Sequence, residues 1–215
     1  MLARKKDVQP LIEAFKRGTP LTYQKGEFII RPGEEPNAVY YIESGIVKAY
    51  NITKYGEESL LSIRKEREVF PLIWAISGKQ RSVIYQTMVP TTVYRLSRSD
   101  YLKFLDSNPE GMSTIMDLTV EMYRIHSERI MTLGYRTVRE RLVSFLYTMA
   151  KRFGRVTKEG TVINVPLRQQ DIAGSINATR ETTGRELSYL SRNGIIKQKD
   201  HMIIVPDTQK LRSFF

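Results

Sequence analysis

Residues 165–190 read Val-Pro-Leu-Arg-Gln-Gln-Asp-Ile-Ala-Gly-Ser-Ile-Asn-Ala-Thr-Arg-Glu-Thr-Thr-Gly-Arg-Glu-Leu-Ser-Tyr-Leu, and they carry the clearest structural signal in the chain. Residues 169–175 predict a short helix with Ile172 on its buried side. Residues 176–178 follow as a turn whose central Asn tolerates a left-handed backbone. Thr179 then predicts the cap of a second helix. Two helices joined by so short a turn indicate a helix-turn-helix.

The second predicted helix has one apolar and one polar face. Thr183, Leu187 and Leu190 recur at i, i+4 and i+7 and form the buried stripe. The opposite face holds residues free to contact a ligand, namely Arg180, Glu181, Gly184, Arg185 and Ser188. Arg donates two hydrogen bonds to guanine and Glu accepts one from cytosine, so this face suits a DNA major groove. The alternative is a solvated helix face with a Glu181–Arg185 pair.

The run Arg180-Glu181-Thr182-Thr183-Gly184-Arg185, preceded by Gln170-Asp171-Ile172-Ala173, resembles the DNA-reading segment of the Crp-Fnr superfamily of cyclic-AMP receptor protein-like bacterial transcription regulators. The resemblance extends over nearly the whole chain. It implies that Arg180, Glu181 and Arg185 read base edges, and we expect Gln170 and Ser188 to contact DNA beside them. It also implies double-stranded DNA and a second subunit as partners, with RNA polymerase as a further one.

The distribution of charge agrees with a DNA-binding C-terminal part. The chain of 215 residues has room for two modest domains, and its net charge of +11 suits a polyanion such as nucleic acid or an acidic membrane surface. Residues 135–215 contain 15 basic and 7 acidic residues, whereas residues 1–134 contain 19 and 16. The basic excess therefore accompanies the predicted helix-turn-helix.

Cysteine and histidine usage limits the chemistry that the chain can support. The sequence has no Cys, which excludes disulfides, Cys-based zinc sites and thiolate-bound iron–sulfur clusters. It has only two His residues, so a multi-His metal site is excluded. No stretch approaches the roughly 18 apolar residues of a membrane helix, and residues 1–7 lack the apolar run of a leader. We therefore expect a cytoplasmic protein without a membrane partner.

The first half of the chain predicts a β-roll. Residues 8–17 have apolar positions at helical spacing and predict a covering helix. Short apolar or alternating runs follow, separated by turn residues, at 28–30, 39–42, 46–50, 59–63, 83–88 and 92–96. Many short strands at near-even spacing are typical of a closed β-roll or jelly roll. The predicted fold class is α+β.

The run Tyr40-Tyr41-Ile42-Glu43-Ser44-Gly45-Ile46-Val47 resembles the cyclic-nucleotide-binding-type barrel of the same superfamily. The resemblance places the phosphate-binding cassette at residues 70–82, where Arg81-Ser82 matches the pair that grips the cyclic phosphate. The family's Gly-Glu-Leu-Gly is here Phe70-Pro71-Leu72-Ile73, so the carboxylate that would hold the ribose hydroxyl is missing. We therefore predict a small, anionic effector other than cyclic AMP, and no certain cofactor. A surface Arg81 paired with a nearby acid is the alternative.

Residues 109–133 predict a long helix opened by Asn108 or Ser107. Its narrow apolar stripe indicates a seam between the helices of two subunits and consists of Ile115, Leu118, Met122 and Ile125. A second stripe is predicted to pack on the barrel and consists of Met116, Val120, Tyr123 and Ile130. His126 and Ser127 lie where the resemblance places effector contacts from both subunits. Haem ligation by His126 is conceivable, although a packed or solvated His is the more common case.

The C-terminal part predicts a winged helix-turn-helix. Residues 134–136 indicate a hinge and residues 137–153 a supporting helix. Apolar runs at 162–165, 195–198 and 202–205 predict a small sheet, with residues 199–201 as its connecting turn. We expect Lys197 and Lys199 to contact phosphates, which position a protein on DNA without reading sequence. The predicted domains are residues 1–106, 107–134 and 135–215.

These features predict a homodimeric transcription regulator that binds a palindromic site. One alternative is a cyclic-nucleotide-type enzyme or channel-regulatory module. The sequence disfavours it, because it shows no nucleophile elbow, no Gly-rich phosphate loop before a helix and no paired metal ligands. A second alternative is a DNA-binding protein that responds to no ligand.

Overall fold

A computed structural model describes residues 9–199 and 202–214. The chain divides into two compact units, one of residues 9–51 and Ser62–His126, the other of Ile52–Leu61 and residues 127–214. The unit boundary therefore falls inside the long helix and differs from the predicted boundaries at residues 106 and 134. Val8, Asp200 and His201, which belong to a predicted helix and a predicted turn, lie outside the described residues.

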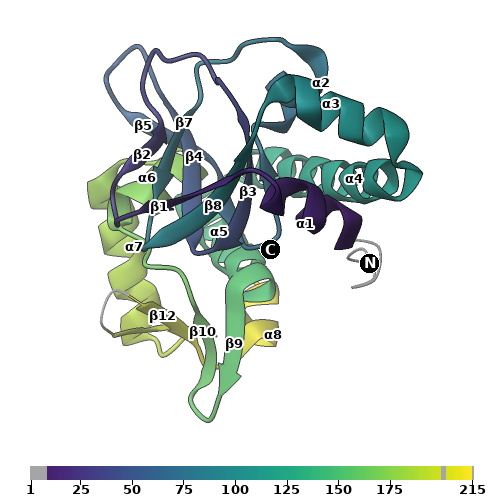
Figure 1. Ribbon diagram of the computed structural model, residues 1–215. Helices are drawn as coiled ribbons and strands as arrows, with labels where there is room; N and C mark the ends of the chain where they lie inside the picture. The colour runs from purple at the N-terminus through teal and green to yellow at the C-terminus, as the bar shows by residue number, and fades with distance from the viewer. Residues whose placement is uncertain (1–8, 200–201, 215) are drawn as a thin grey trace. The chain divides into compact units, whose positions relative to one another are not determined.

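The strands of the N-terminal half form a β-roll of two four-stranded sheets (Figure 1). One sheet has the order β1-β8-β3-β6 and consists of Thr19–Tyr23, Thr91–Leu96, Val39–Ser44 and Val69–Phe70. The other has the order β2-β7-β4-β5 and consists of Phe28–Ile30, Ile84–Thr87, Ile46–Ile52 and Glu58–Lys65. Neighbouring strands run antiparallel, as β3 and β8 do. The predicted α+β fold with an N-terminal β-roll is confirmed.

Aromatic side chains fill the interior of the roll. Phe70 is 0% exposed and stacks between Tyr40 and Tyr85, with ring centroids 5.4 and 4.7 Å apart. Val47 and Val93 belong to the same cluster. Stacked aromatic pairs contribute about 0.5–1.5 kcal/mol each beyond the area that they bury. The interior is therefore a packed core.

Helices cover the other face of the first sheet. They are α1 (Gln9–Lys16), α2 (Leu72–Ser77), α3 (Arg98–Ser107) and α4 (Pro109–Leu133). Because side chains alternate along a strand, Val39 and Tyr41 of β3 point to this side while Tyr40 points inward. Phe15 of α1 stacks on Tyr41 at 5.6 Å. A second hydrophobic cluster thus joins the sheet to its helices.

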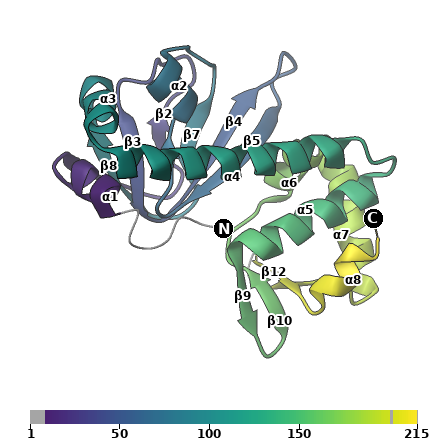
Figure 2. The ribbon, with the colours of Figure 1, turned by 90° about the vertical axis from the view of Figure 1, so that its right-hand side faces the viewer.

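Helix α4 is a single long helix (Figure 2). It begins after Asn108, whose Oδ1 accepts the Gly111 N–H at 2.8 Å, as the sequence predicts. At about 1.5 Å per residue its 25 residues span about 37 Å.

The two apolar stripes of α4 are assigned to the wrong partners in the sequence-based prediction. Ile115, Met122 and Ile125 are buried within the single chain, and Leu118 packs with Ile115 into the cluster that contains α1 and α3. This stripe is therefore not available as a seam between subunits. The stripe that was predicted to pack on the barrel is exposed and consists of Met116, Val120, Tyr123 and Ile130. Spacing identifies an apolar stripe, but it does not say which neighbour covers the stripe.

The second unit begins its globular part with α5 (Val138–Phe153). Thr137, which was predicted as the first residue of this helix, caps it, because its hydroxyl accepts the Glu140 N–H while the Glu140 carboxylate accepts the Thr137 N–H. The bond from the Thr137 backbone is the main reason that the pKa of Glu140 lies below its usual range. Leu142, Leu146 and Met149 form the buried stripe of α5.

After α5 the chain forms a small sheet and three further helices. The sheet has the order β11-β12-β10-β9 and consists of Lys197–Lys199, Met202–Val205, Gly160–Ile163 and Gly154–Thr157. The helices are α6 (Gln169–Ile176), α7 (Arg180–Arg192) and α8 (Thr208–Arg212). Of the helices in the described part of the chain, none is long and apolar enough to cross a membrane.

Candidate nucleic-acid interface

Helices α6 and α7 form a helix-turn-helix with well-defined local geometry. Asn177 ends α6 in the left-handed region, at φ 51°, and the Ala178 N–H donates to Ala173 O at 3.1 Å. Asn accepts this conformation at low cost. Thr179 starts α7, since its Oγ1 accepts the Thr182 N–H at 3.1 Å. The turn and the cap agree with the sequence-based prediction.

The two faces of α7 lie as predicted. Thr183, Leu187 and Leu190 are buried, whereas Arg180, Glu181, Arg185 and Ser188 are exposed. The alternative of a Glu181–Arg185 pair is not what the structure shows, because Arg185 instead donates to Thr182 Oγ1 at 3.2 Å. The polar face is therefore available for contacts outside the chain.

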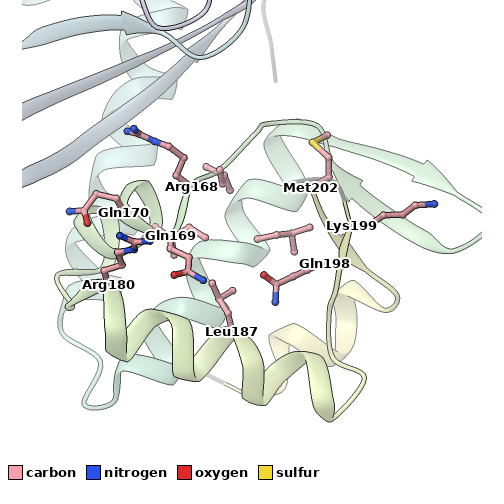
Figure 3. A pocket seen from close by; sticks show the side chains of 11 residues that line it. Arg168, Gln169, Gln170, Arg180, Leu187, Gln198, Lys199 and Met202 are labelled. Carbon is pink, nitrogen blue, oxygen red and sulfur yellow. The ribbon is translucent and has the colours of Figure 1, made fainter.

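A groove of about 640 Å³ lies between α6, α7 and the β11–β12 hairpin (Figure 3). Three residues predicted to contact DNA line it, namely Gln170, Arg180 and Lys199. Arg168, Gln169 and Gln198 also line it and were not predicted. Figure 3 shows Gln169 beside Arg180 at the start of α7. Gln169 packs against Gly184 of α7, where a Cβ would lie only 3.3 Å from Gln169 Oε1. The missing side chain of Gly184 therefore leaves room for Gln169.

The hairpin next to the groove presents polar side chains to solvent. Lys197, Gln198 and Lys199 of β11 are all exposed. The strand pairs with β12 in the register Lys197 to Ile204 and Lys199 to Met202. The Lys199 side chain extends away from α7, whereas Gln198 lies in the groove (Figure 3). The hairpin thus has the position of a wing.

A charged clamp holds α7 against α5. Arg139 of α5 donates to Glu186 Oε2 at 2.7 Å, and its guanidinium carbon lies 3.6 Å from the Tyr189 ring centroid. The hydrogen bond to Glu186 raises the pKa of Arg139 above its ordinary value. Planar stacking of this kind fixes the guanidinium. The clamp therefore ties α7 to α5.

The cations around the groove differ in their partners. Arg168 donates to Asp171 Oδ1 at 3.0 Å and lies 3.2 Å from Glu58 Oε2, both within the second unit. Its charge is therefore largely balanced. Among the described residues, Arg180, Arg185 and the two lysines of β11 make no ion pair. These four side chains carry the uncompensated positive charge next to the groove.

The predicted effector residues come from two segments. Arg81 and Ser82 lie exposed in the coil between α2 and β7, and the half-buried His126 and Ser127 are neighbours on α4. Phe70 is fully buried in the interior of the roll. Ile73, which stands at the position of the last glycine of the family's Gly-Glu-Leu-Gly, is 52% exposed on α2. Residues 9–199 and 202–214 contain no cluster of His, Asp or Glu that could hold a metal ion.

Comparisons with known proteins agree with both halves of the structure. Residues 20–108 match the cyclic nucleotide-binding domain family, and residues 140–214 match the Crp-like helix-turn-helix domain family. The global nitrogen regulator of Synechocystis sp. is 28% identical and covers 96% of each chain. That of Nostoc sp. is 30% identical and covers 81% of this chain and 79% of the relative.

A solved structure supports the fold independently of sequence. FixK2 from Bradyrhizobium japonicum superposes with a TM-score of 0.78 at 24% identity, over 92% of this chain and 96% of that one. At this identity the likeness shows that the two chains share a fold. Together with the relatives in sequence, it shows that the chain belongs to the Crp-Fnr family of DNA-binding transcription regulators.

Proposed function

We propose that the protein is a homodimer that reads a palindromic DNA site through α7. Arg180 and Arg185 each hold a guanine by its O6 and N7 atoms, and Glu181 accepts a hydrogen bond from a cytosine. The observation that carries this proposal is the shared exposed face of these three side chains on a helix capped at Thr179. Gln170 and Ser188 contact DNA on either side of them.

The lysines of the hairpin supply contacts of another kind. Lys197 and Lys199 are exposed and unpaired among the described residues, and we assign them to phosphates. Such contacts position the protein without distinguishing bases. Gln198, which lines the groove, joins Gln169 as an amide within reach of the same duplex.

The exposed stripe of α4 supports the dimer. Met116, Val120, Tyr123 and Ile130 are 58 to 74% exposed and recur at i, i+4, i+7 and i+14. This is the a/d repeat of a two-stranded coiled coil. Ser127 lies at i+11 on the same face, where the helix of a second subunit would meet it. Two-fold symmetry then sets the recognition helices about one turn of DNA apart, roughly 34 Å.

The effector is a small molecule other than cyclic AMP. The stack of Tyr40, Phe70 and Tyr85 occupies the interior of the roll, and Pro71 provides no carboxylate for a ribose hydroxyl. An unpaired buried hydroxyl would cost about 1–3 kcal/mol. Arg81 and Ser82 remain exposed and can bind an anionic group, with His126 and Ser127 as further contacts.

We assign no enzymatic activity to the protein. We place it in the cytoplasm with its DNA, and RNA polymerase is a further proposed partner.

Selection of random duplexes by the full-length protein tests the base contacts. The selected half-site should resemble G-T-G-A, and Arg180→Ala should remove the preference at one position, worth about 1–3 kcal/mol. Lys197→Ala is the matched control, because it should weaken all sequences alike. An unchanged motif with Arg180→Ala would show that α7 is not the reading helix.

Two measurements separate this proposal from its alternatives. Sizing of the protein without DNA should give a dimer. Calorimetry should show no sub-micromolar binding of cyclic AMP or cyclic GMP. The effector proposal would be contradicted if either nucleotide bound with sub-micromolar affinity, if Arg81→Ala abolished that binding, and if the nucleotide also tightened DNA binding. A DNA-binding protein without an effector would keep the same affinity when cell extract is added. An effector-dependent regulator would not.

A further inference from the structure

Arg129, near the end of α4, binds the end of the first helix of the helix-turn-helix. Its Nε donates to Ser175 O at 3.3 Å and its Nη2 donates to Gly174 O at 3.4 Å. Its Nη1 donates to Leu61 O at 3.1 Å. All of these residues belong to the second unit. One guanidinium therefore joins three segments of that unit.

The chemistry of these contacts favours a cation. The last carbonyls of a helix have no partner within the helix and carry its partial negative charge. Arg129 meets two of them with a planar fork of N–H groups, which a single ammonium cannot imitate. Burial lowers the pKa of Arg129 from its ordinary value. The protein thus keeps a desolvated charge here whose described partners are backbone carbonyls.

The same helix end is held from a second direction. Arg141 of α5 donates to Ile176 O at 2.8 Å and to Asn177 O at 3.4 Å. Four consecutive carbonyls, from residue 174 to residue 177, therefore accept from two guanidinium groups. Arg141 fixes this end to α5, whereas Arg129 fixes it to α4.

The third segment approaches α6 too closely for a side chain between them. A Cβ on Gly174 would lie 2.3 Å from Glu58 O and 3.2 Å from Leu60 N. The backbone of Glu58–Leu61 therefore packs directly on α6, and Arg129 bonds the last carbonyl of that stretch. Any rotation of α6 about the end of α4 would break these contacts together.

We propose that Arg129 is a positioning residue for DNA binding, which fixes the helix-turn-helix to the end of α4 and thereby sets the spacing of the two recognition helices. The proposal rests on the proposed dimer, because α4 carries the apolar stripe assigned to the second subunit. Arg129 does not contact DNA in this role. Its loss should therefore change which arrangement of half-sites the dimer accepts, and not which bases each half-site contains.

The test measures affinity as a function of half-site spacing. Full-length wild type and Arg129→Gln are titrated with duplexes that carry the selected half-sites at the preferred spacing or with two base pairs inserted or removed. Two base pairs rotate one half-site by about 70° around the DNA axis. The wild type should prefer one spacing by at least about tenfold. Arg129→Gln should bind that duplex about tenfold more weakly and distinguish the spacings by less than about threefold.

Arg98→Gln is the matched control. Arg98 caps a helix in the same way, with Nε at 3.1 Å from Trp74 O and Ala75 O, but it lies in the first unit. The Arg98→Gln variant should be less stable than the wild type but should keep its preference for one half-site spacing. If Arg129→Gln does not fold, Arg129→Lys keeps the charge but has a single donor nitrogen in place of the planar fork, and it should show the same change to a smaller degree.

Each other outcome overturns the proposal in a recognisable way. If Arg129→Gln weakens all spacings equally, as a loss of folded protein would, Arg129 has a structural role only. If the salt dependence of DNA affinity in Arg129→Gln is lower than in the wild type by about one counterion per subunit, Arg129 is a phosphate contact. A monomeric wild type would overturn the proposed function as well, whereas a dimeric wild type with an unaltered spacing preference in the variant would overturn this proposal alone.

Discussion

Thr183 is a buried polar residue whose replacement should stabilise the protein. Its side chain is 0% exposed in the stripe of α7 that faces the core, and Oγ1 has no hydrogen-bond partner among the described residues. A buried polar atom without a partner costs about 1–3 kcal/mol. Valine keeps the branched shape and the χ1 preference of threonine and lacks the hydroxyl. Thr183→Val should therefore raise the free energy of unfolding by about 1 kcal/mol.

Thr179 provides a matched substitution with the opposite expected sign. It lies four residues earlier, and its Oγ1 accepts the Thr182 N–H at 3.1 Å as the cap of α7. Thr179→Val removes the same atoms and leaves that N–H without its acceptor, so it should destabilise by about 1 kcal/mol. The chemical change is identical in both variants. Only the surroundings of the hydroxyl differ.

Differential scanning calorimetry measures both effects. For a chain of this size, 1 kcal/mol shifts the midpoint of unfolding by about 2–4 °C. The transition of the unit that contains α7 should move upward in Thr183→Val and downward in Thr179→Val, while that of the β-roll stays in place. DNA affinity should not change in Thr183→Val, because the side chain faces away from the groove. A lower midpoint in Thr183→Val would refute the reasoning and show that the hydroxyl has a partner.

Two further predictions concern the first unit. Tyr123→Glu places a charge in the exposed stripe of α4, so sedimentation should show monomers and DNA binding should weaken. The control Glu128→Gln, on the same helix, should leave the dimer intact. Burial raises the pKa of Tyr41 to about 12. The fold therefore favours the neutral phenol, and up to about 3 kcal/mol of stability is lost as pH rises from 10 to 12. Unfolding measured across that range should be less pH-dependent in Tyr41→Phe.

Strands with two distinct faces could be predicted from the sequence, and weakly patterned elements could not. The run Val39-Tyr40-Tyr41-Ile42 forms β3 where it was expected, because each of its faces packs against a different cluster. Strand β1 was missed: it has exposed positions and contains Pro20, which an edge strand tolerates. Helix α3 was also missed, although Ser97 and Asp100 form a recognisable N-terminal cap.

The candidate site was predictable where one helix carries it. The exposed face of α7 follows from its 3.6-residue period, so Arg180, Glu181 and Arg185 could be named in advance. Gln169 and Gln198 could not, since they belong to different elements that meet only in the folded unit. The same limit explains the error on α4. Both stripes are apolar and helically spaced, and only tertiary packing decides that Ile115 faces the core and Tyr123 faces outward.

The salt dependence of DNA affinity can show which cations of the interface bind phosphates and which bind bases. Arg168 is balanced by Asp171 and Glu58, which leaves Arg180, Arg185, Lys197 and Lys199 as the cations near the groove that make no ion pair with a described residue. If the two arginines read bases, only the lysines displace counterions from phosphates, and a dimer displaces about four. The logarithm of affinity should then fall with the logarithm of salt with a slope near −3.6, since each phosphate contact contributes about −0.9. If the arginines bound phosphates as well, the slope would approach about −7. A slope of that size, together with an Arg180→Ala variant that lowers it by about two, would contradict base reading by α7.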